Sequence, residues 1–320
     1  MPTLLKTAPT RFRAYQLGQA GSSFSYFDGQ HFTLIEAMAT DVSKPSLLHE
    51  LAACGKRTID TLHITSWDSD HCSESGLGWA LETLQPAKVE YPGYDPHTDC
   101  AKACLKLLRS YQSQATAKQR SVKLNRIDPP YIQSLEQAQG LGYRNIFYHP
   151  KSIFPSSNDN STVKLFRTGM FNVLSLGDVQ HANIGSMLRS CKIICRETDV
   201  MVLAHHGADN GITTKKFLEC IRPSLAICTS NYDNQYDHPP QSIKSLLYEQ
   251  GVRLCTTKTG DVIIASEAPH RSAYRVINLK AGSTEVSSVT TFRAKKSHLL
   301  SANQDVIRNI YHPGFKGIKR

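Results

Sequence analysis

The chain has 320 residues, of which 40% are hydrophobic and 20% are charged. A chain of this length and composition can bury a full core, which excludes a fibrous or wholly disordered protein. Lysine and arginine total 37 against 27 aspartate and glutamate residues, a formal net charge of +10, and this excess favours acidic partners over basic ones.

No stretch of the sequence approaches the roughly 18 to 20 consecutive apolar residues that a membrane helix needs, and residues 1–13 lack the apolar core of a secretion signal. We therefore expect a cytoplasmic protein without a membrane span. Nine cysteines form an odd set without a CxxC motif, so neither a disulfide framework nor a zinc ribbon is predicted. Most are expected to be small buried hydrophobic residues, although Cys100/Cys104 and Cys191/Cys195 each share a helix face that could hold a metal.

The first half of the chain has the pattern of short hairpins followed by helices and further strands. Turns rich in Gly and Asp separate short apolar runs near the N-terminus, and stretches with helical spacing come next. The strands predicted in this half lie at residues 12–17, 23–27, 31–37, 58–65, 145–148, 163–167 and 171–176, and the helices at 43–54, 76–84 and 99–112.

The second half alternates strands with helices, which predicts a layered α/β sandwich rather than a doubly wound parallel sheet, because hairpins precede the alternation. No linker is evident before about residue 280. The simplest division is therefore one domain at residues 1–280 and a basic C-terminal extension at residues 281–320. The strands predicted in this half lie at residues 200–204, 225–229, 252–256 and 262–266, and the helices at 213–220 and 241–250.

Positive charge is concentrated in two segments. Seven basic residues and no acid lie between Asp99 and Asp128, and residues 291–320 hold seven basic residues against the single acid Asp305. A solvated helix face or a tail would explain either run alone, but the two runs beside the clusters described next favour a surface that binds nucleic acid. The C-terminal run could also engage a protein partner. The predicted nucleic-acid contacts are Lys102, Lys106, Arg109, Lys118, Arg120, Lys123 and Arg126.

Four polar clusters each follow a predicted strand. Two carboxylates and an imidazole share the short loop SWDSDH at residues 66–71, and hard oxygen ligands combined with imidazole suit a divalent metal ion. Each cluster alone also fits a turn, a helix cap or an ordinary histidine pair, but their order at successive strand ends favours one shared site. The other three clusters are Gly177-Asp178, His205-His206-Gly207 and Asp237-His238-Pro239.

In this order the clusters resemble the metallo-β-lactamase fold, and in detail the soluble hydrolase domain of ComEC-type competence proteins. LGQAGSS at residues 17–23 is similar to the opening turn of that domain, and NDNS at 158–161 to its NxNS segment. Residues 231–239 and 259–262 are similar to its closing segments. The resemblance covers roughly residues 11–270 and implies a four-layered αββα sandwich of the metallo-β-lactamase type.

The resemblance also implies hydrolysis assisted by one or two divalent ions, Mn²⁺ or Zn²⁺. Asp70 and His71 would hold the second ion, Asp68 would serve the first, and Asp178 would bridge the two. An Asp-rich ligand set leans toward Mn²⁺.

The remaining histidines complete the implied site. His206 is the preferred metal ligand of its pair and His205 a contact for substrate phosphate, with the reverse assignment left open. His238 would face the scissile group as a proton donor or phosphate contact. The residues expected to take part in catalysis are therefore Asp70, His205 and His238.

One position departs from the family pattern. Ser66 stands where the first motif usually begins with a histidine, so a first ion would lose an imidazole ligand. His63, His97 or His149 could substitute, and His149 is preferred because it ends a predicted strand. Glu36, which ends an early hairpin, is interpreted as structural.

The leading hypothesis is a metal-dependent phosphodiesterase that acts on nucleic acid, DNA above all. An alternative keeps the fold but assigns a small substrate, such as a cyclic nucleotide, a thioester, a lactone or an amide. A further alternative is a nucleic-acid-binding module whose catalytic site has decayed at Ser66.

Overall fold

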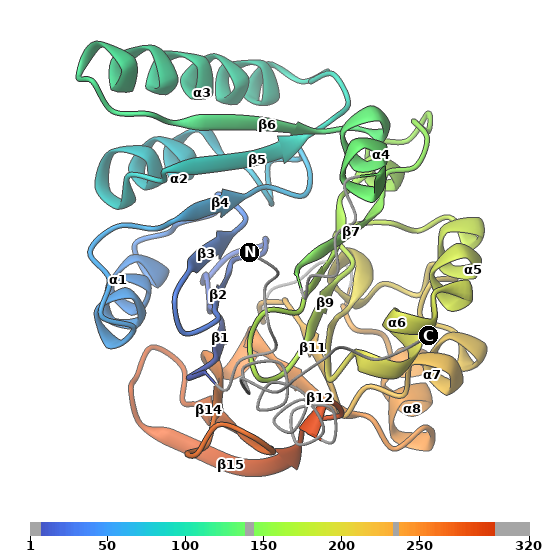
Figure 1. Cartoon of the computed structure of the whole chain (residues 1–320). Coiled ribbons are helices and arrows are strands. Elements are labelled where there is room, and N and C mark those ends of the chain that lie inside the picture. Colours follow the sequence, from blue (N-terminus) through green and yellow to red (C-terminus); the bar gives the residue numbers. More distant parts are fainter. Residues whose placement is uncertain (1–7, 138–143, 233–236, 298–320) are drawn as a thin grey trace, which may run out of the picture.

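The computed structural model describes residues 8–137, 144–232 and 237–297. Within these residues two β-sheets pack face to face between two layers of helices (Figure 1). The predicted four-layered αββα sandwich is confirmed. The strands of the first sheet are, in spatial order, β15 (Val286–Arg293), β14 (Ala273–Leu279), β13 (Val262–Ser266), β1 (Arg11–Ala14), β2 (Phe24–Phe27), β3 (Phe32–Ile35), β4 (Thr61–His63), β5 (Lys88–Pro92) and β6 (Lys123–Ile127).

The second sheet has six strands, and four of them, β9 to β12, run parallel. In the first sheet β1 to β3 form antiparallel hairpins, while β3 to β6 run parallel. The carboxyl ends of parallel strands meet at one edge of each sheet, so loops that follow them can share a site. The strands of the second sheet are, in spatial order, β12 (Arg253–Thr256), β11 (Leu225–Cys228), β10 (Val200–Val202), β9 (Val173–Ser175), β8 (Val163–Phe166) and β7 (Ile146–His149).

Helices cover the outer face of each sheet (Figure 1). The first sheet is covered by α1 (Ser43–Ala53), α2 (Glu74–Trp79) and α3 (Asp99–Ala117), and the second by α5 (Ala182–Ser190), α6 (Lys192–Glu197), α7 (Lys215–Ile221) and α8 (Gln241–Glu249). The short α4 (Pro129–Gln137) packs its apolar face on β7 and β6. No helix in the described ranges is both long enough and apolar enough to cross a membrane.

Apolar side chains fill three layers of the sandwich. One cluster joins the first sheet to α1–α3 and another joins the second sheet to α5–α8. Between the sheets, a third cluster gathers aromatic side chains that include Phe12, Phe24, Phe166 and Phe171, all 2% exposed or less. Burial of this apolar surface is the main force that holds the sheets together.

Several elements lie where the sequence pattern gave no clear signal. β5 and β6 have the sequences KVEYP and KLNRI, whose charged residues hide strand alternation. β15 pairs along its length with β14, so the sheet continues into the predicted C-terminal extension. The division at residue 280 stays a prediction, and residues 298–320 lie outside the described part.

The cysteines differ from the prediction at one pair. Cys195 of α6 and Cys220 of α7 form a disulfide with their Cα atoms 5.3 Å apart. The spacing of the nine cysteines in the sequence did not indicate this pair. Cys195 is therefore not available to hold a metal with Cys191. Cys100 and Cys104 share one face of α3, and both thiols point at the carbonyl oxygen of Cys72.

Candidate metal centre

The loop after β4 meets the ends of two strands of the other sheet. Asp70 and His71 come from this loop, Asp178 follows β9, and His206 lies in a single turn, η3 (Ala204–Gly207), after β10. One potential ligand atom from each of these four residues lies within 4.8 Å of the other three. We call these four residues the metal group. The structure thus brings together four of the five metal ligands predicted from sequence.

The short contacts within the metal group involve opposite charges. His206 Nε2 lies 2.9 Å from Asp70 Oδ2, and His71 Nε2 lies 2.9 Å from Asp178 Oδ2 and 4.0 Å from Asp70 Oδ1. His71 Nε2 is buried yet has no hydrogen bond of acceptable geometry among the described residues. A buried imidazole nitrogen facing two carboxylates in this way fits a site for a divalent ion, since Asp and His are ligands of Zn²⁺ and Mn²⁺.

The outward nitrogens of both imidazoles are held by other residues. His71 Nδ1 lies 3.2 Å from Glu36 Oε1 and 3.3 Å from the hydroxyl of Thr65, which donates a 2.5 Å hydrogen bond to the same carboxylate. His206 Nδ1 lies 3.0 Å from the hydroxyl of Thr229. Such contacts fix the ring orientation of a metal-binding histidine and raise its affinity for metal.

Two glycines allow the loops to approach each other. Ser22 N donates a 2.9 Å hydrogen bond to the carbonyl of Asp70, and a Cβ on the preceding Gly21 (φ +133°) would lie 2.7 Å from that oxygen. A Cβ on Gly177 (φ +55°) would lie 2.8 Å from Cβ of Ser161. Glycine is therefore required at both positions, because each has a positive φ and a close neighbour.

The electrostatics of the metal group reflect its mixed charges. Burial would raise the pKa of Asp70 and of Asp178, but the neighbouring imidazoles outweigh burial and hold both pKa values below their usual range. Burial would lower the pKa of His71, but Asp178 and Glu36 outweigh it and raise the pKa well above the usual value. A raised pKa favours the protonated form of His71, and binding of a metal ion at Nε2 would have to displace that proton.

Asp68, the fifth predicted ligand, lies outside the metal group. Its Oδ2 accepts hydrogen bonds from Ser66 Oγ at 2.9 Å and from Ser157 Oγ at 3.3 Å. Tyr94 OH in turn lies 2.9 Å from Ser66 Oγ and accepts a hydrogen bond from the backbone of residue 67. A network of hydroxyls thus surrounds the predicted first-ion ligand, and the role of Asp68 as a ligand stays a prediction.

The histidines considered as substitutes are used elsewhere. His149 is 1% exposed, and its Nε2 donates a 2.6 Å hydrogen bond to the carbonyl of Asp159. His63 Nδ1 lies 3.1 Å from Glu90 Oε2, and His97 is exposed. None of the three belongs to the metal group.

His205 and His238 lie beside the metal group. Their ring centroids are 6.2 Å apart, and the ring of His205 lies 6.2 Å from that of His206. His205 and His206 both adopt left-handed backbone angles, with φ of 48° and 53°, a conformation that costs energy in residues with a side chain. This turn carries His205 and His206, and His238 reaches them from the loop after β11. The catalytic roles of His205 and His238 stay a prediction.

Several supporting residues were not predicted. Thr65, Thr229 and Tyr94 are single polar residues that no sequence pattern marks. Asp159 accepts hydrogen bonds from the backbone N–H groups of residues 180 and 181 and so fixes the loop that carries Asp178. The place of Asp159 in the NDNS segment was the only sequence feature that could have indicated this role. Glu36 was noted in the sequence but interpreted as structural.

Two curated proteins resemble the chain in sequence. ComE operon protein 3 of Bacillus subtilis is 24% identical over 224 residues, which are 68% of this chain and 26% of that protein. Competence protein ComA of Neisseria gonorrhoeae is 33% identical over 60 residues, 19% of this chain and 8% of that protein. The chain thus spans about a quarter or less of these relatives, and the first supports the ComEC-type resemblance. No protein-family model matches the chain.

Among solved structures, Tm1679, described as a metal-dependent hydrolase of the β-lactamase superfamily, is 13% identical with a TM-score of 0.44 over 79% of this chain and 98% of that one. Igni18, a metallo hydrolase from Ignicoccus hospitalis, is 12% identical with a TM-score of 0.39 over 79% and 98%. CmlA, a diiron β-hydroxylase from Streptomyces venezuelae, is 12% identical with a TM-score of 0.42 over 81% and 54%.

Proposed function

We propose that the chain is a metal-dependent hydrolase that cleaves phosphodiester bonds of nucleic acid, DNA above all. The observation that carries the proposal is the convergence of two carboxylates and two imidazoles within 4.8 Å, with the buried Nε2 of His71 facing the carboxylates of Asp178 and Asp70. A divalent ion at such a site lowers the pKa of water and stabilises negative charge on phosphoryl oxygens. Mn²⁺ and Zn²⁺ are the ions to test first.

The residues around the metal group have separate tasks in this proposal. The metal group holds the ion, and Asp68 would serve a second ion if one binds. His205 and His238 contact the substrate phosphate or donate a proton to the leaving oxygen. Burial and the charge of His205 lower the pKa of His238, so its neutral form predominates near neutral pH, which favours a contact with the substrate phosphate over proton donation.

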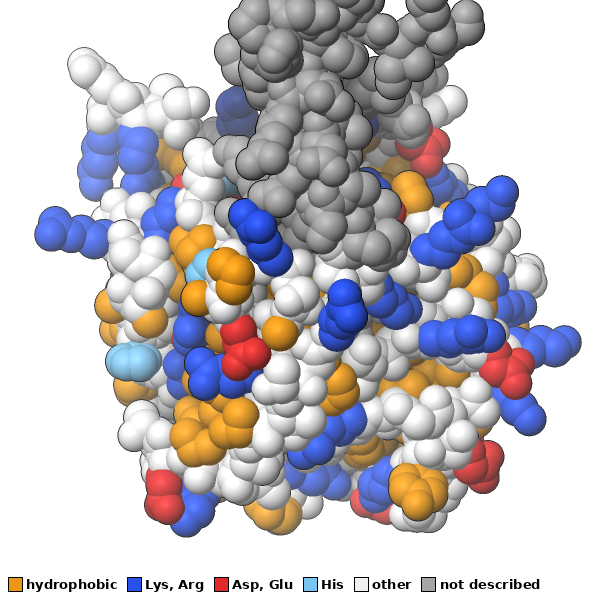
Figure 2. Space-filling model, turned by 60° about the horizontal axis from the view of Figure 1, so that its bottom comes forward, with side chains coloured by type: hydrophobic (Ala, Val, Ile, Leu, Met, Phe, Trp, Pro, Cys, Tyr) orange, Lys and Arg blue, Asp and Glu red, His pale blue; other side chains and the backbone are white. Residues whose placement is uncertain are grey.

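Nucleic acid is the proposed substrate because of charge and similarity. The chain carries a formal net charge of +10, and Lys and Arg side chains spread over the face at the bottom of Figure 1 (Figure 2). On α3 and β6, Lys102, Lys106, Arg109, Lys123 and Arg126 are exposed. Such charges attract the phosphate backbone without regard to sequence. One of the similar proteins is named a competence protein, which fits DNA as a substrate.

The setting of this activity is also part of the proposal. We place the protein in the cytoplasm, with the basic residues near the C-terminus as a contact for nucleic acid or a protein partner.

Cleavage of single- and double-stranded DNA by the purified chain with Mn²⁺ or Zn²⁺ tests the proposal. Asp70→Ala is expected to abolish cleavage, because it removes a ligand of the proposed ion. Asp209→Ala is the matched control, since Asp209 is exposed and hydrogen-bonded only to Ser242 among described partners. Equal activity of wild type and Asp70→Ala would overturn the assignment.

Two other results would select the alternatives. Hydrolysis of a small chromogenic phosphodiester without cleavage of DNA would favour a small-molecule substrate. DNA binding without hydrolysis, together with less than about 0.2 equivalents of bound metal, would favour a decayed site.

A further inference from the structure

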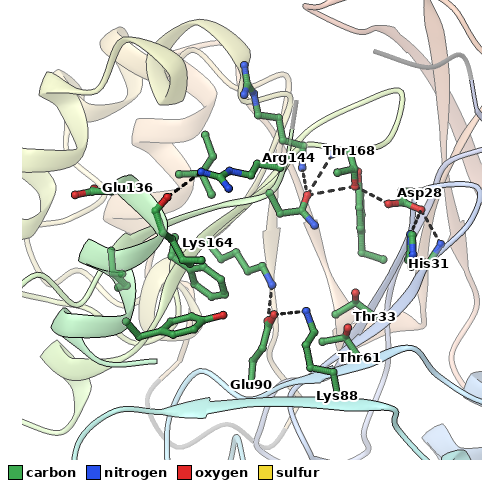
Figure 3. Close-up of a pocket in the computed structure, with 18 of the residues that line it drawn as sticks. Asp28, His31, Thr33, Thr61, Lys88, Glu90, Glu136, Arg144, Lys164 and Thr168 are labelled. Atoms are coloured by element: carbon green, nitrogen blue, oxygen red, sulfur yellow. Dashed lines mark hydrogen bonds and ion pairs between the residues drawn. The ribbon is translucent and has the colours of Figure 1, made fainter. Parts of the chain in front are cut away.

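A cavity of about 520 Å³ lies between the two sheets, away from the metal group (Figure 3). Residues of β3, β4 and β5 line it from one sheet, residues of β7 and β8 line it from the other, and α4 closes one side. None of the four residues of the metal group is part of the lining. The volume lies within the range of small-molecule sites in proteins.

The polar character of this cavity is unusual for the inside of a sandwich. Thr33, Thr61, Lys88 and Glu90 face it from successive strands, while the residues between them pack on the outer helices. Elsewhere between the sheets the same inward positions carry apolar side chains. Packing alone would favour apolar residues here too, because burying charge costs free energy.

Two ammonium groups share one carboxylate at the floor of the cavity. Lys164 Nζ lies 2.5 Å from Glu90 Oε2, and Lys88 Nζ lies 2.8 Å from Glu90 Oε1. The side chains of Lys164 and Glu90 are 4% and 3% exposed. Burial and the charge of Lys164 lower the pKa of the adjacent His63, which keeps that imidazole neutral. The floor therefore has one more positive charge than it has negative charges.

The other charged groups around the cavity do not cancel this excess. Arg167 forms a two-bond ion pair with Glu197, and Glu136 pairs with Lys151. The carboxylate of Asp28 accepts hydrogen bonds from two backbone N–H groups and from the hydroxyl of Thr168, and it keeps its negative charge. Arg144, at the end of the cavity far from the floor in Figure 3, supplies a positive charge that offsets Asp28, so the excess of the floor remains.

We propose that this cavity binds a small molecule through a phosphate group. Lys164 approaches from β8, while Lys88, Thr33 and Thr61 approach from the facing sheet, so the donors come from opposite walls. A phosphate group offers at least three acceptor oxygens in a tetrahedral arrangement, so it can accept from both walls and from the threonine hydroxyls at once, which is more than the two oxygens of a carboxylate allow. The volume beyond the floor, next to the ring of Tyr131, has room for an organic group.

Isothermal titration of the full chain with inorganic phosphate and with adenosine monophosphate tests this proposal. The titration is carried out with a chelator present, and again with Asp70→Ala, so that the metal group does not contribute. One saturable site is expected in both cases. Tighter binding of the nucleotide would identify an organic phosphate as the ligand, and equal binding would identify phosphate itself.

Lys88→Met is expected to weaken binding about tenfold or more, because it removes a charged donor from the site. Lys44→Met is the matched control. Lys88 pairs with Glu90 at 2.8 Å and Lys44 pairs with Asp41 at 2.9 Å, and the two lysine side chains are 36% and 30% exposed. Thr33→Val with Thr61→Val provides a second test that leaves the charge unchanged. Absence of saturable binding up to about 10 mM, or equal effects of Lys88→Met and Lys44→Met, would overturn the proposal.

Discussion

The strand β4 ends in the loop of Asp70 and His71 of the metal group, whereas its first residue, Thr61, lines the cavity. Both regions bury ionisable side chains, but the net charge of these side chains has opposite sign in the two regions. The metal group joins two carboxylates to two imidazoles, while the cavity floor joins two ammonium groups to one carboxylate. The sign of the uncompensated charge thus differs between the regions, and it suits a cation in one and an anion in the other.

The strongest test of this comparison removes charge from the metal group. Asp178→Asn takes away a buried carboxylate. We therefore expect the rate of hydrolysis to fall at least about a thousandfold, and the variant to retain much less metal than wild type. DNA cleavage rates and metal content measure the two effects. Phosphate binding in the cavity should not change, and a parallel loss there would show that the two regions are not independent.

At the cavity, the corresponding change is Glu90→Gln. It leaves the ammonium of Lys164 buried without its carboxylate, so we expect the free energy of unfolding to fall by about 3 to 5 kcal/mol. Denaturant unfolding measures this change. Glu136→Gln, which breaks an exposed ion pair with Lys151, should cost less than about 1 kcal/mol. Similar costs for the two variants would mean that the cavity pair is solvated like a surface pair.

A smaller effect is expected at Glu36, which contacts a histidine of the metal group but does not belong to that group. Glu36→Gln weakens the support of His71 Nδ1, so the dissociation constant of the metal should rise about 10- to 100-fold. Competition with a chromogenic chelator measures it. Glu74→Gln, an exposed residue of α2, is the control. If Glu36 were only structural, as the sequence suggested, melting temperature would fall without a change in metal affinity.

The smallest effect concerns His149, which belongs to neither region. Burial lowers its pKa to about 4, so between pH 6.5 and 4 the unfolded chain binds a proton that the folded chain does not. This contribution to stability is lost as the pH falls, by about 2 kcal/mol at pH 5. His149→Gln, which keeps a donor for the carbonyl of Asp159, should lose less stability than wild type between pH 7 and 5 in denaturant unfolding. An unchanged pH dependence would contradict the prediction.

The two regions also differ in how far they could be predicted. The clusters that hold the metal group were found because they stand in short polar loops directly after strands, and the resemblance to the metallo-β-lactamase fold implied which of their residues are ligands. The cavity gave no such signal, because Thr33, Thr61 and Glu90 are single polar residues within strands. β5, which carries Lys88 and Glu90, was not predicted at all, since its charged residues interrupt the apolar alternation.

The amino-acid sequence by itself determined the layered α/β architecture and the order of the ligand-bearing loops, because strand periodicity, turns and motif order are properties of neighbouring residues. Only the tertiary structure decided which of these residues meet. Asp70 and His206 are separated by 136 residues and Lys164 and Glu90 by 74, and packing of the two sheets brings each pair within 2.9 Å. Such distances depend on how the whole sandwich packs, and packing is a property of all layers together.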